Sequence, residues 1–177
     1  MIAHDLAAGN GVCIVDPHGE LAEAALSLVP PSRFHEVRYL NPVDAKPVPF
    51  NPLHGIPLED RPRVADAVLS AFRAVWGWTP ETAPRALPLL RNAIRTALDL
   101  PAPTFLDVMR LLDDEHQRGR ATDPVNRRYW ERLATRDKRY QDEAIDPVLT
   151  RLDTLLGSPD VRATLCQTPT FEEFTTS

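Results

Sequence analysis

The sequence predicts an α/β fragment followed by an all-α domain, on three observations. Residues 12–15 form a continuous apolar run between a glycine and an Asp-Pro pair. Such a run is typical of a strand that is buried on both faces of a parallel sheet. Helical patterns flank this run, and a second strand-like run follows at residues 37–40. From residue 61 to residue 168, apolar residues recur at helical spacing.

The predicted α/β part covers residues 1–60. Helices are expected over residues 1–8 and 20–28, one on each side of the first strand. The order helix, strand, helix, strand predicts a right-handed parallel crossover, and the proline-rich residues 41–60 are expected to form an extended connector. A sheet of two strands is marginal without neighbours. We therefore expect residues 12–15 to expose an apolar face and the chain to associate.

The predicted all-α domain covers residues 61–168 and begins with a helix that Pro62 opens. A second helix is expected over residues 84–100, with Pro88 tolerated only if it falls in the first turn. The inward-facing residues of these two helices are expected to be Val64, Val68, Phe72 and Val75, then Leu87, Leu90, Ile94 and Leu98.

Later helix starts are marked by capping patterns. Thr104 with Asp107 predicts a capping box, and the pairs at 123–124 and 158–159 each place a capping residue before a proline. A long apolar stripe over residues 144–156 predicts a helix that Pro147 should kink or restart. Residues 169–177 are expected to lead back toward the sheet.

Composition excludes several classes of protein. The 177 residues are 43% hydrophobic and 25% charged, which is typical of a globular chain. No apolar run is long enough for a membrane helix, the N-terminus does not look like a secretory signal, and two cysteines make no disulfide framework. The net charge of −5 gives no general argument for binding nucleic acid.

A short polar motif follows the first predicted strand and contains Asp16, His18, Gly19 and Glu20. Ligands of parallel α/β sheets bind beyond the carboxyl ends of the strands, so these residues could face a phosphate or a metal ion. A simpler interpretation is equally open. Asp16 could cap the following helix, and Gly19 could supply a positive φ angle.

Residues 12–21 resemble the "DPHG[DE]L" segment of HerA/FtsK-type P-loop ATPases, in particular the coupling proteins of conjugative transfer and type IV secretion. Residues 39–42 and 49–53 resemble that group's "Y-x-(N/D)-P" and "(G/P)FNPL" segments, in the same order. Residues 61–168 are similar to its helical insertion, notably around Trp76-Gly77 and Tyr129-Trp130. The match spans nearly the whole chain.

This resemblance implies a RecA-like parallel sheet, a cofactor of ATP with Mg²⁺, and DNA translocation in the intact family. It places Asp16 and Gly19 at the cofactor, and Asp16, His18 and Glu20 beside the nucleotide pocket or the subunit interface. It implies as partners DNA, identical or intact motor subunits in a ring, and relaxosome or secretion proteins. The implied location is the bacterial cytoplasm, reaching the inner face of the membrane through partners.

The family's phosphate loop, G-x-x-x-x-G-K-[ST], is missing from these residues, because neither Lys46 nor Lys138 stands in such a motif. No Walker B segment is found either. We therefore expect a fragment of a DNA-translocating ATPase that has no catalytic residues in isolation, no resident metal and no ATP hydrolysis of its own.

A basic stretch over residues 118–139 holds eight bases and three acids, a local charge of +5. Arginines interleaved with aromatic residues can contact phosphates and stack on unpaired bases. The alternative is a solvated helix face with Tyr129 and Trp130 packed inward. The candidate DNA contacts are Arg127, Arg128, Arg132 and Arg136.

Two further hypotheses come from other classes of protein. Asp16-x-His18-Gly19 resembles the first metal motif of metallophosphoesterases, but the Gly-Asn-His and Gly-His-x-His segments of those enzymes are missing. The other hypothesis is a non-enzymatic module that binds DNA or a partner, or a remnant with no independent role.

Overall fold

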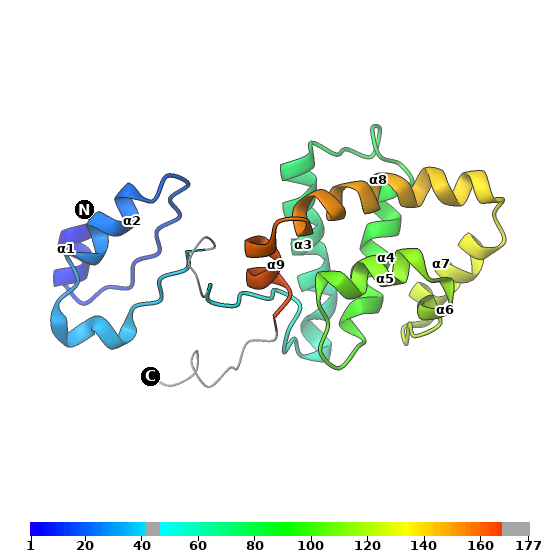
Figure 1. The fold of residues 1–177 in the computed structure, drawn as a ribbon. Coiled ribbons are helices and arrows are strands. Elements are labelled where there is room, and N and C mark those ends of the chain that lie inside the picture. Colours follow the sequence, from blue (N-terminus) through cyan, green and yellow to red (C-terminus); the bar gives the residue numbers. More distant parts are fainter. Residues whose placement is uncertain (42–46, 168–177) are drawn as a thin grey trace. The chain divides into compact units, whose positions relative to one another are not determined.

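The computed structural model describes residues 1–41 and 47–167. The chain divides into two compact units, an N-terminal unit over Met1–Tyr39 and a helical unit that begins at Leu40. Every regular element in the described residues is a helix, and none of these residues belongs to a strand (Figure 1). The predicted parallel sheet of a P-loop fold is therefore wrong for this chain. The predicted return to that sheet at residues 169–177 lies outside the described residues.

The N-terminal unit contains two short α-helices and one 3₁₀ helix: α1 (Ile2–Ala7), α2 (Glu20–Leu26) and η1 (Pro31–Glu36). Both α-helices agree with the sequence prediction, although α2 is shorter than expected. Arg33 connects parts of the unit, because its Nη1 donates to the carbonyl oxygen of Leu6 at 3.0 Å and its Nε donates to Glu36 at 2.8 Å.

The two predicted strands are single extended segments. Residues 12–15 and 37–40 make no backbone hydrogen bonds with each other, and Val15 is 88% exposed. A strand that is buried on both faces needs a paired neighbour and a covering layer on each side. Neither is present within the described part of this unit, so the apolar run gains nothing from pairing. The predicted exposure of this run is confirmed for Val12, Cys13 and Val15.

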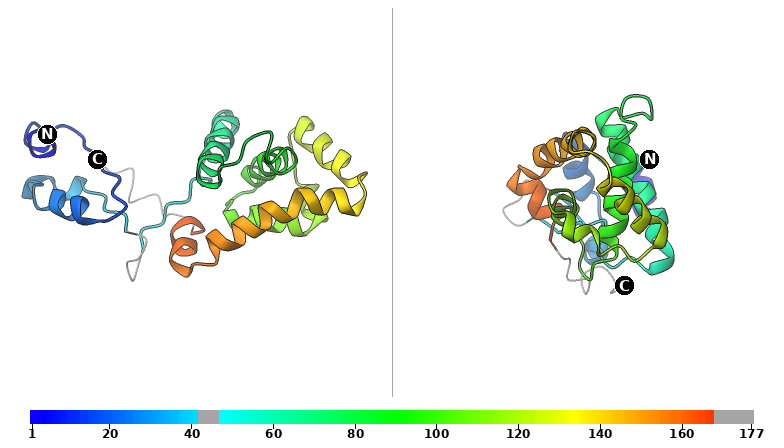
Figure 2. Two further views of the ribbon diagram at one scale, coloured as in Figure 1. Left: turned by 90° about the horizontal axis from the view of Figure 1, so that it is seen from above. Right: turned by 90° about the vertical axis from the view of Figure 1, so that its right-hand side faces the viewer.

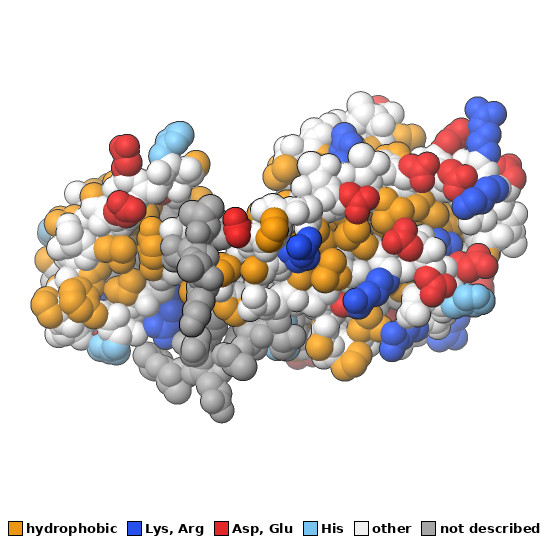
Figure 3. Space-filling view, in the orientation of Figure 1, with side chains coloured by type: hydrophobic (Ala, Val, Ile, Leu, Met, Phe, Trp, Pro, Cys, Tyr) orange, Lys and Arg blue, Asp and Glu red, His pale blue; other side chains and the backbone are white. Residues whose placement is uncertain are grey.

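The N-terminal unit has almost no core of its own. Ala25 is the one buried residue among those that the structure describes there. Leu21 on α2 is 51% exposed, and Leu28, just beyond the end of that helix, is 49% exposed. Figure 3 shows hydrophobic side chains spread over the visible face of this unit. A unit of this size is marginal without an apolar core, a disulfide or a metal.

The helical unit begins with a short 3₁₀ helix and continues through seven α-helices in its described residues. In chain order they are η2 (Leu58–Asp60), α3 (Arg61–Trp76), α4 (Ala86–Leu98), α5 (Phe105–Asp113), α6 (Glu115–Arg118), α7 (Pro124–Ala134), α8 (Lys138–Leu156) and α9 (Pro159–Leu165). Helix α4 is central, since it packs against α3, α5, α7 and α8. Figures 1 and 2 show α8 running along the unit from α7 to α9.

The apolar pattern of α4 predicted its burial correctly. Leu87, Leu90, Ile94 and Leu98 all lie in the core. Pro88 is the third residue of the helix, in the first turn, where backbone N–H groups have no partner within the helix.

The predicted inward face of α3 is confirmed for Phe72, and Val68 is partly buried against the core, but the prediction is wrong for Val75. Ala65, Leu69 and Phe72 are buried, whereas Val75 is 77% exposed. Aromatic contacts hold Phe72 in the core. The Phe72 ring packs edge-on against Phe105, with the ring centroids 5.4 Å apart, and it stacks on Trp76.

The predicted helix starts are confirmed. Thr104 and Asp107 form the capping box of α5, and Asp123 caps α7 by accepting from the N–H of Asn126 at 2.8 Å. Ser158 precedes α9, without a side-chain capping bond. Helix α8 continues through Pro147 as a single element, so the predicted restart does not occur.

The proline-rich connector packs onto the helical unit over part of its length. Leu53 is only 1% exposed, and the side-chain amide of Asn51 donates to the carbonyl oxygen of Pro103 at 2.8 Å. The N–H of Phe50 donates to the carbonyl oxygen of Thr164 at 2.8 Å. Residues 47–60, which the sequence grouped with the α/β part, thus belong to the helical unit.

A buried hydroxyl joins α4 to α7. Thr96 Oγ1 donates to the carbonyl oxygen of Asn92 at 2.8 Å. It accepts from the side-chain amide of Asn126 at 2.7 Å and from the indole N–H of Trp130 at 2.8 Å. Thr96, Asn126 and Trp130 are all buried. The bonds therefore determine which face of α7 turns toward the core.

Thr96→Val should destabilise the helical unit by at least about 2 kcal/mol. It leaves two buried donors without an acceptor, and each such donor costs about 1–3 kcal/mol. Denaturant unfolding followed by tryptophan fluorescence measures this loss, because Trp76, Trp78 and Trp130 all lie in the helical unit.

The matched control is Thr154→Val, whose exposed hydroxyl makes the same bond to a carbonyl oxygen four residues earlier. We expect a change of about 0.5 kcal/mol or less there. Equal losses in the two variants would show that the buried hydrogen bonds contribute nothing specific.

The exposed apolar side chains of Leu21 on α2 and Leu28 just after it should make the chain associate and bind the dye ANS. Replacing Leu21 and Leu28 together by Gln removes apolar surface without touching the helical unit, so both effects should fall. Val125→Gln on α7 is the control, since Val125 is also exposed, at 72%. Sedimentation velocity over a range of concentrations measures association. A wild-type chain that is monomeric and does not increase the fluorescence of ANS would contradict the prediction.

Candidate functional site

Asp16 acts as a cap for α2. Its Oδ2 accepts from the backbone N–H groups of Leu21 at 2.8 Å and Ala22 at 3.1 Å, and its Oδ1 accepts from the N–H of His18 at 3.0 Å. Gly19 stands directly before the helix with a φ angle of 87°, a conformation that favours glycine. The capping interpretation of this motif thus describes both Asp16 and Gly19.

The bonds to backbone N–H groups, that of Ala22 foremost, hold the pKa of the Asp16 carboxyl below its ordinary value of 3.8. They stabilise the charged form of the carboxylate. His18 and Glu20 are exposed, and no hydrogen bond or ion pair joins their side chains to that of Asp16. The structure therefore does not bring the three candidate residues together as a chemical group.

ATP with Mg²⁺ does not fit these residues. A nucleotide needs backbone N–H groups that are free to surround its phosphates, and a metal needs free oxygen ligands. Here Asp16 already takes the N–H groups at the start of α2. Within residues 1–41 and 47–167, no three His, Cys, Asp or Glu side chains gather as a group that could hold a metal ion.

The basic stretch is divided by the structure into paired and unpaired residues. Lys138 pairs with Asp142 at 2.8 Å, and Arg139 pairs with Glu143 at 2.9 Å, each one helical turn along α8. These two bases are thus neutralised on their own helix. They offer little attraction to an external anion.

Arg118 is buried and has a structural role. Its Nε donates to the carbonyl oxygen of Leu111 at 2.9 Å and its Nη2 donates to that of Leu112 at 2.7 Å, which closes the end of α5. Its guanidinium also lies 5.5 Å from the ring centroid of Trp130. Burial lowers its pKa. The sequence did not distinguish this arginine from its exposed neighbours.

The four candidate DNA contacts are all exposed, and none of them pairs with a carboxylate in the described part of the chain. The side chains of Arg128 and Arg132 make no hydrogen bond or ion pair there. Arg127 donates from Nε and Nη2 to the carbonyl oxygen of Ala121, both at 3.4 Å. Arg136 lies over the ring of Tyr140, with its guanidinium carbon 5.0 Å from the centroid.

The outward direction of these arginines follows from the buried face of α7. Asn126, Trp130 and Leu133 turn into the core, so Arg128 and Arg132 lie on the opposite side of the helix. The exposed Glu131 is the only acid within α7. We call this surface, made by Arg127, Arg128, Arg132 and Arg136, the arginine face.

The aromatic residues of the stretch do not offer open stacking surfaces. Trp130 is buried, and Tyr129 packs edge-on against it with ring centroids 5.4 Å apart. Burial raises the pKa of the Tyr129 hydroxyl. The inward packing that belonged to the alternative of a solvated helix face is found for Trp130 and in part for Tyr129, so the arginine face is suited to phosphates more than to bases.

The contacts of Tyr140 with two arginines were not predicted from the sequence. Its ring is contacted by two guanidiniums, those of Arg136 and of Arg85, whose carbon lies 4.4 Å from the ring centroid. Arg85 also pairs with Glu143. These residues come from segments more than 50 positions apart, and only the packing of α4 against α8 brings them together.

No protein-family model, curated protein or solved structure matches this chain. None of the helices in its described residues has both the length and the apolar character needed to span a membrane.

Acid should weaken the cap of α2. Because the hydrogen bonds hold the Asp16 pKa below 3.8, their contribution to stability is complete above that value. It is lost as the pH falls from there through the folded-state pKa. NMR should show the N–H signals of Leu21 and Ala22 moving in step with titration of the Asp16 carboxyl.

Asp16→Asn is the control, because its side-chain oxygen can still accept a bond but does not titrate in this range. Its two N–H signals should not follow the acid titration. Wild-type signals that stay constant through the titration of the carboxyl would show that Asp16 does not cap α2 in solution.

Proposed function

We propose that the helical unit is a DNA-contacting domain of a DNA-translocating motor of the conjugative-transfer type. The single observation that carries this proposal is the arginine face, where four exposed guanidiniums have no carboxylate partner among the described residues. The resemblance of residues 61–168 to the helical insertion of coupling proteins supports it. The proposal does not depend on a sheet in the N-terminal unit.

DNA binding on this surface is local and electrostatic. The whole chain has a net charge of −5, so its total charge opposes DNA. Helix α7 bears three arginines and one acid, and Arg136 adds a further guanidinium just beyond its end. Arginine forks form bidentate hydrogen bonds with phosphate oxygens. Contacts to phosphate give affinity without reading the sequence of bases.

We further propose that the chain alone does not hydrolyse ATP. No G-x-x-x-x-G-K-[ST] motif occurs in the 177 residues, and the polar motif that could have faced a nucleotide caps α2 instead. Nucleotide chemistry would then belong to the intact motor subunits with which the domain acts.

A second candidate function is partner binding by the N-terminal unit. Its exposed apolar residues, among them Val15, Leu21 and Phe34, favour contact with another protein. Motor subunits and secretion or relaxosome proteins are the partners that the sequence resemblance suggests. This candidate is compatible with DNA contact by the helical unit.

Removing two arginines from the arginine face should lower the salt dependence of DNA binding. For each phosphate that the protein no longer neutralises, the slope of log K against log salt falls by about 0.9 on duplex DNA and about 0.7 on single strands. Arg128→Gln with Arg132→Gln should therefore lower the slope by about 1.8 or about 1.4, as measured by fluorescence anisotropy.

Lys138→Gln with Arg139→Gln is the matched control. It removes the same total charge, but from bases that already pair with Asp142 and Glu143. Its slope should stay that of the wild type. The proposal fails if the wild-type chain does not bind DNA, or if the two double variants reduce affinity and slope equally.

A further inference from the structure

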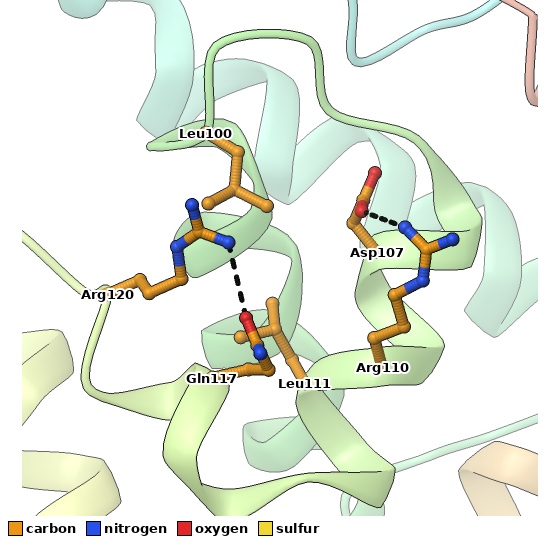
Figure 4. A pocket seen from close by; sticks show the side chains of 6 residues that line it. All are labelled: Leu100, Asp107, Arg110, Leu111, Gln117 and Arg120. Carbon is orange, nitrogen blue, oxygen red and sulfur yellow. Dashed lines mark hydrogen bonds and ion pairs between the residues drawn. The ribbon is translucent and has the colours of Figure 1, made fainter.

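A hollow of about 230 Å³ lies beside α5 and α6 in the helical unit (Figure 4). It is made by the residues just after α4, by α5 and α6, and by the residues that follow α6. Its lining residues are Leu100, Asp107, Arg110, Leu111, Gln117 and Arg120. One water occupies about 30 Å³ in the liquid, so the hollow is large enough for a small hydrated anion.

Two guanidiniums line the hollow, and each has N–H groups that are not used in hydrogen bonds with the described residues. Arg110 uses Nη1 to donate to Asp107 Oδ1 at 2.8 Å, and Arg120 uses Nη1 to donate to Gln117 Oε1 at 3.2 Å. The other nitrogens of both side chains make no hydrogen bond with the described residues. Figure 4 shows the two arginines on opposite sides, with Leu111 between them.

The one carboxylate of the lining is already neutralised. Asp107 Oδ2 accepts from the N–H of Thr104 at 2.9 Å and from its hydroxyl at 2.8 Å, while Oδ1 accepts from Arg110. The lining therefore has a formal charge of +1 with no unpaired acid. Guanidinium nitrogens without a partner in the described residues suit an oxyanion that takes bidentate bonds.

The hollow is connected to the arginine face through one residue. Arg127 donates to the carbonyl oxygen of Ala121, and Ala121 directly follows Arg120 in the chain. One residue and one pair of hydrogen bonds thus separate Arg120 from Arg127. Ala121 itself is 2% exposed, which makes this connection part of the packed unit.

We propose that this hollow binds a phosphate group of the DNA backbone, between Arg110 and Arg120. The inference rests on the proposed function and extends the DNA contact from α7 to α5 and α6. It would add one phosphate contact outside the arginine face.

Arg120→Gln tests the proposal, because Arg120 caps no helix and its loss should leave the fold intact. We expect the salt slope of duplex binding to fall by about 0.9. Arg120→Lys keeps the charge but lacks the fork, so it should keep the slope and bind with lower affinity. Arg63→Gln is a control for the loss of one exposed arginine elsewhere in the helical unit, since Arg63 pairs with Asp60 and does not line the hollow.

A second measurement uses inorganic phosphate and NMR of the same full chain. Phosphate should shift the signals of Leu100, Leu111 and the Arg120 side chain in the wild type and not in Arg120→Gln. The wild-type signals could shift with phosphate while Arg120→Gln leaves the salt slope of DNA binding unchanged. That result would show that the hollow binds free phosphate and not a phosphate group of DNA.

The remaining outcomes are also decisive. If Arg120→Gln and Arg63→Gln behave alike while Arg128→Gln with Arg132→Gln lowers the slope, the hollow is not a DNA contact and the proposed function stands. If the wild-type chain does not bind DNA, both proposals fail together.

Discussion

Burial of α4 is the constraint on which the helical unit depends. This helix contacts α3, α5, α7 and α8, and its apolar residues fill the space between them. Large aliphatic side chains buried on several sides contribute about 1.5–3 kcal/mol each. Helix α3 packs mainly against α4 and η2, helix α5 against α4, α6 and α8, and helix α8 against α4, α5 and α9. Helix α4 is the neighbour that these three helices share, so it forms the common core of the unit.

The buried hydroxyl of Thr96, a polar group within that core, links the fold to the candidate site. Thr96 on α4 accepts hydrogen bonds from Asn126 and Trp130 on α7. A buried donor finds few alternative partners, so these bonds fix the rotation of α7 about its axis. The same rotation turns Arg128 and Arg132 to solvent. The arginine face is thus a consequence of a buried threonine, although the two lie on opposite sides of α7.

The N-terminal unit shows what local interactions achieve without burial. Asp16 caps α2, Gly19 takes the left-handed conformation, and Arg33 bonds to the carbonyl oxygen of Leu6. These contacts define short helices, but Leu21 and Leu28 stay exposed. Helices as short as α2 are marginal in water by themselves. The unit is therefore suited to completion by another polypeptide surface.

The sequence by itself determined the elements whose signals are local. Capping at Thr104 and Asp123 and the helical spacing of Leu90 and Ile94 act within a few residues, so their patterns were sufficient, whereas the sequence left the cap formed by Asp16 as one of two interpretations. Pairing of strands and sorting of charges are not local. Residues 12–15 have the composition of a strand, but a strand forms only where a neighbour supplies hydrogen bonds.

Likewise Arg118 and Arg128 look alike in the sequence. Only the tertiary structure buried the first against Trp130 and left the second free, because carbonyl groups and carboxylates from distant positions decide which guanidinium is already satisfied.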